Sequence, residues 1–275
     1  MTIARRAYER ALSACALSLV AVLCACATVR TTGSYSLSGK PITYASGGKG
    51  SPTVVFESGL GNGKEVWGRV LPAIERTHQV FAYDRPGYGG SRSVPGMRDP
   101  CTVAAEERNL LRSVGIMPPY ILVGHSIGGL YQYVYAKLYP QDVAGVVLVD
   151  PTHPGWRQAL QRDAPMSASL GHALTRIDET QRREWDNMDD CPSRIDTTTP
   201  LHIPARVLVV DKFGPLSLGI KDLYRKLSPD WSRLAGVEVE MVSGSGHYIQ
   251  NERPQAVIDA IAAVSTSIGA SPENP

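Results

Sequence analysis

Ser126 has the local surroundings of a catalytic nucleophile. It lies in Gly-His-Ser-Ile-Gly (124–128), after the apolar run 120–123 and before apolar residues at helical spacing in 130–138. A strand, a tight turn with small residues around a serine, and a helix together project the serine hydroxyl from a sheet. The amide of Ile127 would lie at the helix N-terminus, where it favours a developing oxyanion. The alternative is a chance Gly-x-Ser-x-Gly, and the flanking strand and helix argue against it.

A serine hydroxyl is a poor nucleophile unless a neighbouring base removes its proton. His247 is the candidate base, because it lies in a glycine-rich segment (244–248) after the last predicted strand and downstream of Ser126. The remaining histidines precede the serine or fall in or beside the segment 151–203, and they are His78, His125, His153, His172 and His202. We therefore predict that His247 is the base, although His153 also follows a strand end.

Two aspartates compete for the role of the acid that orients the base. Asp150 ends the apolar run 143–149, and Asp211 ends the run 206–210. Catalytic groups gather at the carboxyl ends of strands in open α/β sheets, so both positions are suitable. Asp84 also ends a predicted strand, but it precedes the serine. From the residues alone, Asp150 and Asp211 both remain candidates.

These residues need a sheet to bring them together, and the sequence predicts one. Predicted strands cover 35–37, 42–45, 53–57, 80–83, 120–123, 143–149, 206–210 and 237–242, and predicted helices cover 65–76, 102–114, 130–138, 221–227 and 254–268. Strands that alternate with helices and are apolar on both faces indicate a mostly parallel sheet covered by helices on both faces. The segment 151–203 breaks this alternation with charges, prolines and two tryptophans, so we interpret it as an inserted helical cap.

The resulting organisation has one α/β core interrupted by the cap. We expect a signal peptide at 1–26, a linker at 27–34, the first part of the core at 35–150, the cap at 151–203, the second part of the core at 204–268 and a flexible tail at 269–275. Apolar residues make up 43% of the 275 residues and charged residues 20%, which is typical of a globular protein. The net charge of +2 gives no reason to expect a nucleic-acid partner.

The N-terminal segment resembles a bacterial export signal. Arginines at 5–10 precede an apolar stretch at 12–27, which is short for a membrane span. Leu-Cys-Ala-Cys (23–26) resembles the lipobox of lipoproteins, so we expect lipidation at Cys26 and a protein anchored in the periplasm or cell envelope. A simple cleavage site at 25–27 is the alternative.

Export would leave two cysteines in the folded part of the chain. Three of the five cysteines lie in the leader, and Cys101 and Cys191 remain. In an oxidising compartment such a pair is expected to form a disulfide, which would tether the cap to the core. Two buried free thiols are the alternative.

The sequence resembles the α/β-hydrolase family over about residues 50–268. The resemblance rests on four segments. Ser-Gly-Leu-Gly (58–61) stands at the position of the family's oxyanion loop, and Asp-Arg-Pro-Gly-Tyr-Gly-Gly-Ser (84–91) follows the fourth strand. The other two are the serine turn (124–129) and Gly-His (246–247). It implies that the backbone amides of Leu60 and Ile127 bind the oxyanion.

The chain departs from this family in two places. Residue 58 is serine where the family has histidine, which matters little because the donor is a backbone amide. Most members also carry the acid a few residues past the seventh strand, and that position here is not acidic. Some members, including certain haloalkane dehalogenases, use an acid at the end of the sixth strand, which Asp150 matches. We therefore favour Asp150 over Asp211.

The resemblance implies a serine hydrolase that cleaves carboxylic ester-like bonds of a small molecule through an acyl-enzyme, without a metal or cofactor, and the N-terminal signal implies that it is exported. Apolar cap residues could line an acyl pocket or only pack the cap, and they are Trp156, Met166, Leu170, Leu174, Trp185 and Met188. One alternative resembles proline iminopeptidases, with an amine bound by Glu184, Asp186, Asp189 and Asp190, although a solvated acidic face explains these residues better. The other alternative is a non-catalytic surface lipoprotein. The sequence indicates neither the physiological substrate nor the oligomeric state.

Overall fold

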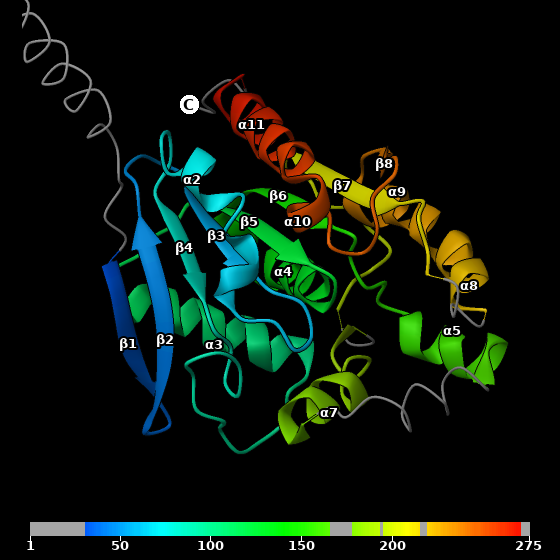
Figure 1. The fold of residues 1–275 in the computed structure, drawn as a ribbon, viewed down its shortest axis with the longest axis horizontal. Helices are drawn as coiled ribbons and strands as arrows, with labels where there is room; N and C mark the ends of the chain where they lie inside the picture. The colour runs from blue at the N-terminus through cyan, green and yellow to red at the C-terminus, as the bar shows by residue number, and fades with distance from the viewer. Residues whose placement is uncertain (1–30, 166–177, 193–194, 215–218, 271–275) are drawn as a thin grey trace, which may run out of the picture.

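A single eight-stranded sheet organises the protein. The computed structural model describes residues 31–165, 178–192, 195–214 and 219–270. The strands are β1 (Thr31–Leu37), β2 (Lys40–Gly47), β3 (Thr53–Glu57), β4 (Val80–Tyr83), β5 (Tyr120–His125), β6 (Val143–Val149), β7 (Ala205–Val210) and β8 (Val239–Val242). Their order is β1-β2-β4-β3-β5-β6-β7-β8, and β3 to β8 run parallel (Figure 1). β1 and β2 form an antiparallel hairpin at the edge.

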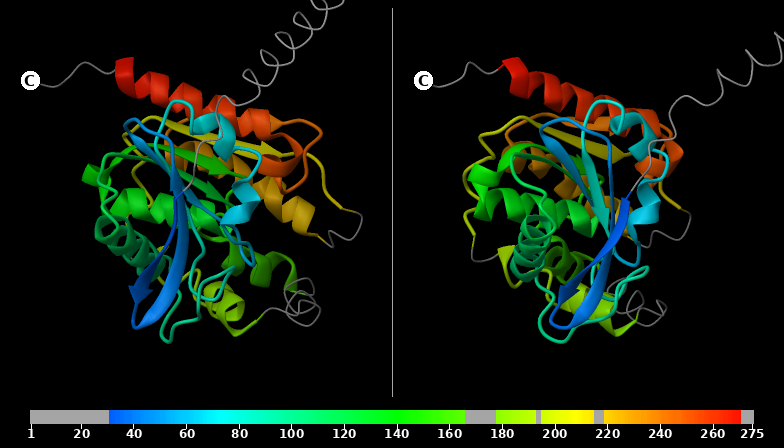
Figure 2. Two further views of the ribbon diagram at one scale, coloured as in Figure 1. Left: turned by 60° about the vertical axis from the view of Figure 1, so that its left-hand side comes forward. Right: turned by 90° about the vertical axis from the view of Figure 1, so that its left-hand side faces the viewer.

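Helices cover both faces of the sheet, which explains why its central strands are apolar throughout. They are η1 (Lys64–Trp67), α2 (Leu71–Ile74), α3 (Pro100–Ser113), α4 (Ile127–Leu138), η2 (Pro140–Asp142), α5 (Trp156–Asp163), α7 (Glu179–Asp186), α8 (Ile220–Leu227), η4 (Ser228–Asp230), α9 (Trp231–Ala235), α10 (Ile249–Glu252) and α11 (Pro254–Ala270). One buried cluster contains side chains of α3, α4 and α9, and a second contains those of η1, α2 and α11. In the ribbon, the red helix α11 lies on one side of the sheet and the green helices α3 and α4 lie on the other (Figure 2). A parallel sheet between two such layers exposes few apolar side chains.

Several predicted elements and boundaries differ from the structure. The helix predicted at 65–76 is two short helices, η1 and α2, because Gly68 is a poor helix former and Pro72 lacks the amide that would continue the helix. Residues 31–34 belong to β1 rather than to a linker, because their backbone pairs with 43–46 whatever their side chains are. Residues 269–270 extend α11 by part of a turn.

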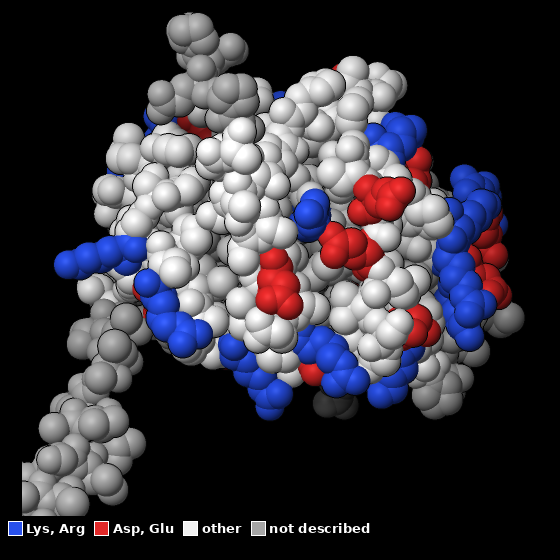
Figure 3. All heavy atoms as spheres, turned by 90° about the horizontal axis from the view of Figure 1, so that it is seen from above, with Lys and Arg blue, Asp and Glu red and all other residues white. Residues whose placement is uncertain are grey.

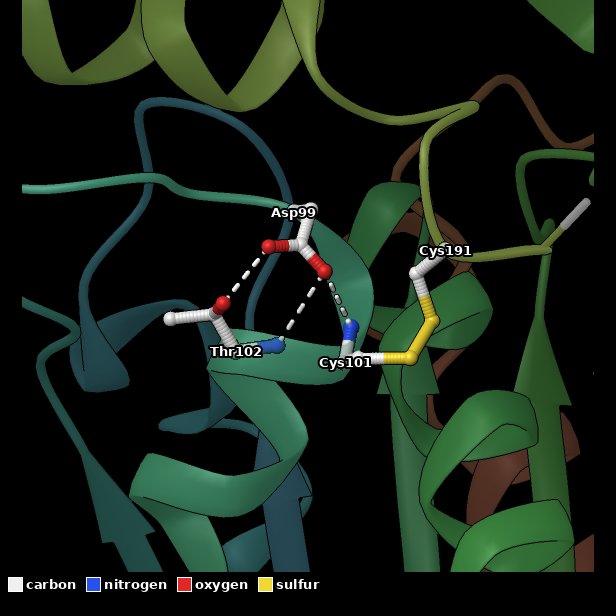
Figure 4. The surroundings of a disulfide bond; sticks show 4 residues. All are labelled: Asp99, Cys101, Thr102 and Cys191. Carbon is white, nitrogen blue, oxygen red and sulfur yellow. Dashed lines mark hydrogen bonds between the residues drawn. A yellow bond between two sulfur atoms is a disulfide. The ribbon is translucent and has the colours of Figure 1, made fainter. Parts of the chain in front are cut away.

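The cap segment contributes two described helices, α5 and α7. Both lie beyond the carboxyl ends of the parallel strands (Figure 1). Cys191, which follows α7, forms a disulfide with Cys101 at the start of α3, and their Cα atoms are 5.6 Å apart (Figure 4). Asp99 caps α3 by accepting from the Cys101 and Thr102 amides. Asp99 also lies near both sulfurs, but the disulfide uses the thiols that a metal would need.

The described surface carries charges of both signs. On the face shown in Figure 3, basic and acidic side chains are interspersed. No helix among the described residues combines the length and the apolar character needed to cross a membrane. The predicted signal peptide and its Cys26 lie outside the described residues.

Candidate active site

The backbone of Ser126 is held in a strained turn between β5 and α4. Its φ of 56° and ψ of −124° lie outside the regions that non-glycine residues usually adopt. A Cβ atom on Gly124 would come within 2.4 Å of the Gly128 carbonyl oxygen, and one on Gly128 within 2.5 Å of the Glu57 carbonyl oxygen. Only glycine at these two positions lets strand and helix approach closely enough to form the turn.

Ser126, His247 and Asp150 form a continuous hydrogen-bonded chain. His247 Nε2 lies 3.0 Å from Ser126 Oγ, and His247 Nδ1 lies 2.5 Å from Asp150 Oδ2. The serine comes from the β5–α4 turn, the aspartate from the end of β6 and the histidine from the loop between β8 and α10. The aspartate side chain is 2% exposed and the histidine side chain 49%, so a buried charge faces an accessible imidazole. This arrangement allows proton transfer from the serine hydroxyl.

Asp150 has a second partner, which the sequence did not indicate. Tyr224 on α8 donates a hydrogen bond to Asp150 Oδ1 and accepts one from the Val210 amide at 2.9 Å. Burial and the Asp150 charge raise the pKa of Tyr224, so the hydroxyl stays protonated. No sequence signal could have found this tyrosine, because 74 residues separate it from Asp150 and only the packing of α8 brings them together.

Asp211, the alternative acid, does not contact His247. It is exposed, and its carboxylate accepts a hydrogen bond from the Gly244 amide at 2.9 Å. This bond holds the start of the loop that carries His247. The structure therefore places Asp150, and not Asp211, against the imidazole.

His125 holds the backbone of His247 through a hydrogen bond. It is fully buried, and its Nε2 lies 2.8 Å from the His247 carbonyl oxygen. Burial and the nearby His247 lower the pKa of His125 to about 3, so its neutral ring donates this hydrogen bond. His153 instead hydrogen-bonds Asp230 at 2.9 Å.

Two pockets meet at His247. The smaller has a volume of about 200 Å³ and is lined by Leu60, Ser126, Ile127, Trp185 and His247, among others. It thus brings both predicted oxyanion residues beside the serine. The larger, of about 530 Å³, lies on the Asp150 side and is lined largely by apolar and aromatic side chains of α5, α8 and the β7–α8 loop.

The predicted cap residues divide between these pockets. Trp156 lines the larger one, whereas Trp185 and Met188 line the smaller one. Met166, Leu170 and Leu174 lie outside the described residues. Glu184, one of four acids considered for binding an amine, is fully buried and is held by Arg85 rather than facing either pocket.

Comparison with known proteins gives the same fold. A family model described as the alpha/beta hydrolase fold matches residues 52–169. The uncharacterized protein YqjL of Bacillus subtilis is 34% identical over 104 residues, which are 38% of this chain and 41% of that protein. RutD of Klebsiella pneumoniae, named as a carbamate hydrolase, is 34% identical over 108 residues, 39% of each protein. The chain thus spans about two fifths of the length of these relatives.

Solved structures resemble this one over most of its length. The epoxide hydrolase CorEH has a TM-score of 0.65 at 19% identity and covers 87% of this chain and 100% of its own. A membrane phospholipase A, described as a bacterial virulence factor, has a TM-score of 0.63 at 21% identity and covers 88% of this chain and 87% of its own. At these identities the likeness concerns the fold alone.

Proposed function

Because the chain belongs to the α/β-hydrolase family, we propose that it is a serine hydrolase that cleaves carboxylic ester-like bonds through an acyl-enzyme. The observation that carries this proposal is the chain of hydrogen bonds from Ser126 through His247 to Asp150, at 3.0 and 2.5 Å. Ser126 stands on a strained turn beside a pocket, where a substrate carbonyl could reach its hydroxyl.

The proposed reaction has two halves. Ser126 Oγ attacks the ester carbonyl carbon while His247 Nε2 takes the hydroxyl proton, and Asp150 stabilises the imidazolium that forms. The amides of Leu60 and Ile127 donate to the oxyanion of the tetrahedral intermediate. The intermediate expels the alcohol, which leaves with the proton from His247. Water, deprotonated by the same histidine, then attacks the acyl-enzyme and releases the carboxylic acid and Ser126.

The nucleophile and the acidic cluster favour ester-like substrates over the alternatives. Family members that open epoxides or remove halides use aspartate as the nucleophile, as the resemblance implies, whereas this chain has Ser126. An aminopeptidase would need a carboxylate at the pocket for the substrate amine. Of the four acids considered for this role, Glu184 pairs with Arg85, and none lines either pocket.

We also propose that the protein acts outside the cytoplasm, anchored through a lipid on Cys26. This proposal rests on the basic, apolar and Leu-Cys-Ala-Cys pattern of residues 1–26.

A substrate screen with a matched pair of serine variants tests the activity. We would measure hydrolysis of p-nitrophenyl esters of increasing acyl length, together with aminoacyl anilides and aryl carbamates. We expect ester turnover in the wild type and a loss of about 10⁴- to 10⁶-fold in kcat for Ser126→Ala. Ser232→Ala, at an exposed serine on α9, should retain full activity and full labelling by a fluorophosphonate probe. Ester turnover that survives in Ser126→Ala would refute the mechanism, and a wild type that neither turns over esters nor reacts with the probe would favour a binding protein.

A further inference from the structure

A buried arginine lies directly behind the loop that carries the proposed oxyanion amide. Arg85 follows β4, and its side chain is 1% exposed. Its Nη1 donates to the Glu57 carboxylate and to the Ser58 carbonyl oxygen, both at 2.5 Å. Its Nη2 donates to the Gly59 carbonyl oxygen at 3.1 Å. One side of the guanidinium therefore holds the end of β3 and the first residues of the loop.

The other side of Arg85 binds the cap. Nε and Nη2 each donate to one carboxylate oxygen of Glu184 on α7, at 3.0 Å, in the forked geometry that suits a carboxylate. Tyr88 donates to the same carboxylate at 2.7 Å. With these bonds all five N–H groups of the guanidinium have acceptors, from β3, from the loop and from α7.

The bond to Gly59 determines which way the Leu60 amide points. The Gly59 carbonyl and the Leu60 N–H belong to one trans peptide unit, in which they point in opposite directions. Arg85 and the Asn62 amide, at 3.2 Å, both donate to this carbonyl oxygen. The Leu60 N–H is thus turned away from the guanidinium, and Gly59 and Leu60 line the pocket that contains Ser126.

We propose that Arg85 is a positioning residue for catalysis: it orients and polarises the Gly59–Leu60 peptide, and Glu184 makes that orientation depend on the docked position of α7. The proposal rests on the proposed function, in which the Leu60 amide binds the oxyanion. A charged donor on the carbonyl strengthens the N–H on the other side of the same peptide, because hydrogen bonds in a chain polarise one another. A cap helix that moves away would remove two of the acceptors that hold the guanidinium.

A lysine could not replace this arginine. Its three N–H groups radiate from one nitrogen, so it cannot donate to Glu184 as a fork and also reach the Ser58 and Gly59 carbonyls. Arg98 offers a matched control, because it is equally buried and pairs with Glu106 at 2.5 Å, while its approach to Glu184, at 3.7 Å, is longer than a hydrogen bond. None of these contacts involves the oxyanion loop.

The test compares Arg85→Lys with Arg98→Lys. For each variant we would measure kcat and KM for a p-nitrophenyl ester, and the affinity for an aryl trifluoromethyl ketone, whose serine adduct carries an oxyanion. Removal of a whole oxyanion donor costs about 10²–10³ in kcat, so a misplaced donor should cost between about 10-fold and that value. We expect Arg85→Lys to lower kcat and ketone affinity together with KM almost unchanged, and Arg98→Lys to change none of the three by more than about 3-fold.

Glu184→Gln provides the second variant, in case Arg85→Lys does not fold. Its amide keeps one acceptor for Arg85 and turns an N–H₂ group toward the other donor, so the fork is lost while the side-chain volume is kept. We expect a smaller loss of kcat and ketone affinity in the same direction, in protein with wild-type circular dichroism. The proposal would be overturned by an Arg85→Lys variant whose kcat/KM falls through KM alone, by one whose ketone affinity equals that of the wild type, or by losses in Arg98→Lys as large as those in Arg85→Lys.

Ser126→Ala separates this inference from the proposed function. If Ser126→Ala stays active, the proposed function fails. If it is inactive while the Arg85 and Glu184 variants behave as wild type, only this inference fails.

Discussion

Replacement of Asp150 by asparagine should move the ring proton of His247 from Nδ1 to Nε2. Asp150 Oδ2 faces His247 Nδ1, and Oδ1 accepts from the Tyr224 hydroxyl. That hydroxyl already accepts from the Val210 amide, so its proton is directed to Asp150. In Asp150→Asn the amide oxygen keeps the tyrosine donor, and the amide N–H₂ then faces His247 Nδ1. The imidazole must carry its proton on Nε2, where it can no longer accept the proton of Ser126.

The size of the effect follows from these contacts. The opposite amide orientation would restore the correct tautomer but leave the buried tyrosine proton without an acceptor, at a cost of about 1–3 kcal/mol. The inactive orientation is therefore favoured by roughly 5- to 150-fold. The neutral amide also no longer stabilises the imidazolium. Together we expect kcat to fall by about 10⁴-fold, equivalent to about 5.5 kcal/mol of transition-state stabilisation.

Measuring kcat for ester hydrolysis in four variants tests this explanation. Asp211→Asn should stay within a few fold of wild type, because an amide oxygen can still accept from the Gly244 amide. The double variant Asp150→Asn/Tyr224→Phe should be more active than Asp150→Asn, by up to the roughly 5- to 150-fold preference for the inactive amide orientation. Without the tyrosine hydroxyl, the amide can turn its oxygen toward His247. Tyr224→Phe alone should be slower than wild type, since Asp150 loses a donor. A double variant whose loss equals the product of the single losses would refute the tautomer argument, and an Asp211→Asn loss as large as that of Asp150→Asn would refute the assignment.

Three further predictions concern stability and maturation. The double variant Cys101→Ala/Cys191→Ala removes the disulfide, which closes a loop over 90 residues. Its unfolding free energy should therefore fall by about 4 kcal/mol and its Tm by roughly 10 °C, and melting curves equal to those of the wild type would contradict this. Because burial lowers the pKa of His125 to about 3, the unfolded state binds a proton that the native state does not as pH falls from about 6.5 toward 3. Stability should therefore decline there by up to about 1.4 kcal/mol per pH unit, and urea titrations of His125→Gln should show a shallower decline; parallel curves would argue against it. Palmitate labelling in a bacterial host should mark the wild type and miss Cys26→Ser, and an unlabelled wild type would exclude the anchor.

Local sequence patterns were sufficient for much of the fold and for two residues that the structure brings together in the candidate site. The predicted strands at 53–57, 80–83 and 143–149 coincide with β3, β4 and β6, because short apolar runs bounded by turn residues leave little freedom in a sheet covered on both faces. Ser126 was found from its neighbours, since the strained turn needs small residues at fixed spacing. His247 was found from its place after the last strand.

What the sequence left open depended on contacts between distant segments. The choice between Asp150 and Asp211 required the path of the loop that carries His247, and both aspartates end neighbouring strands. Tyr224 reaches Asp150 only because α8 packs against the ends of β6 and β7, and Glu184 reaches Arg85 across 99 residues of chain. Spacing along the chain determines which residues share one helix face or one strand, whereas the packing of whole elements determines which side chains from different elements meet. The proposed nucleophile could therefore be predicted from a five-residue pattern, but the groups that orient its proposed base and the proposed oxyanion loop were determined only by the tertiary structure.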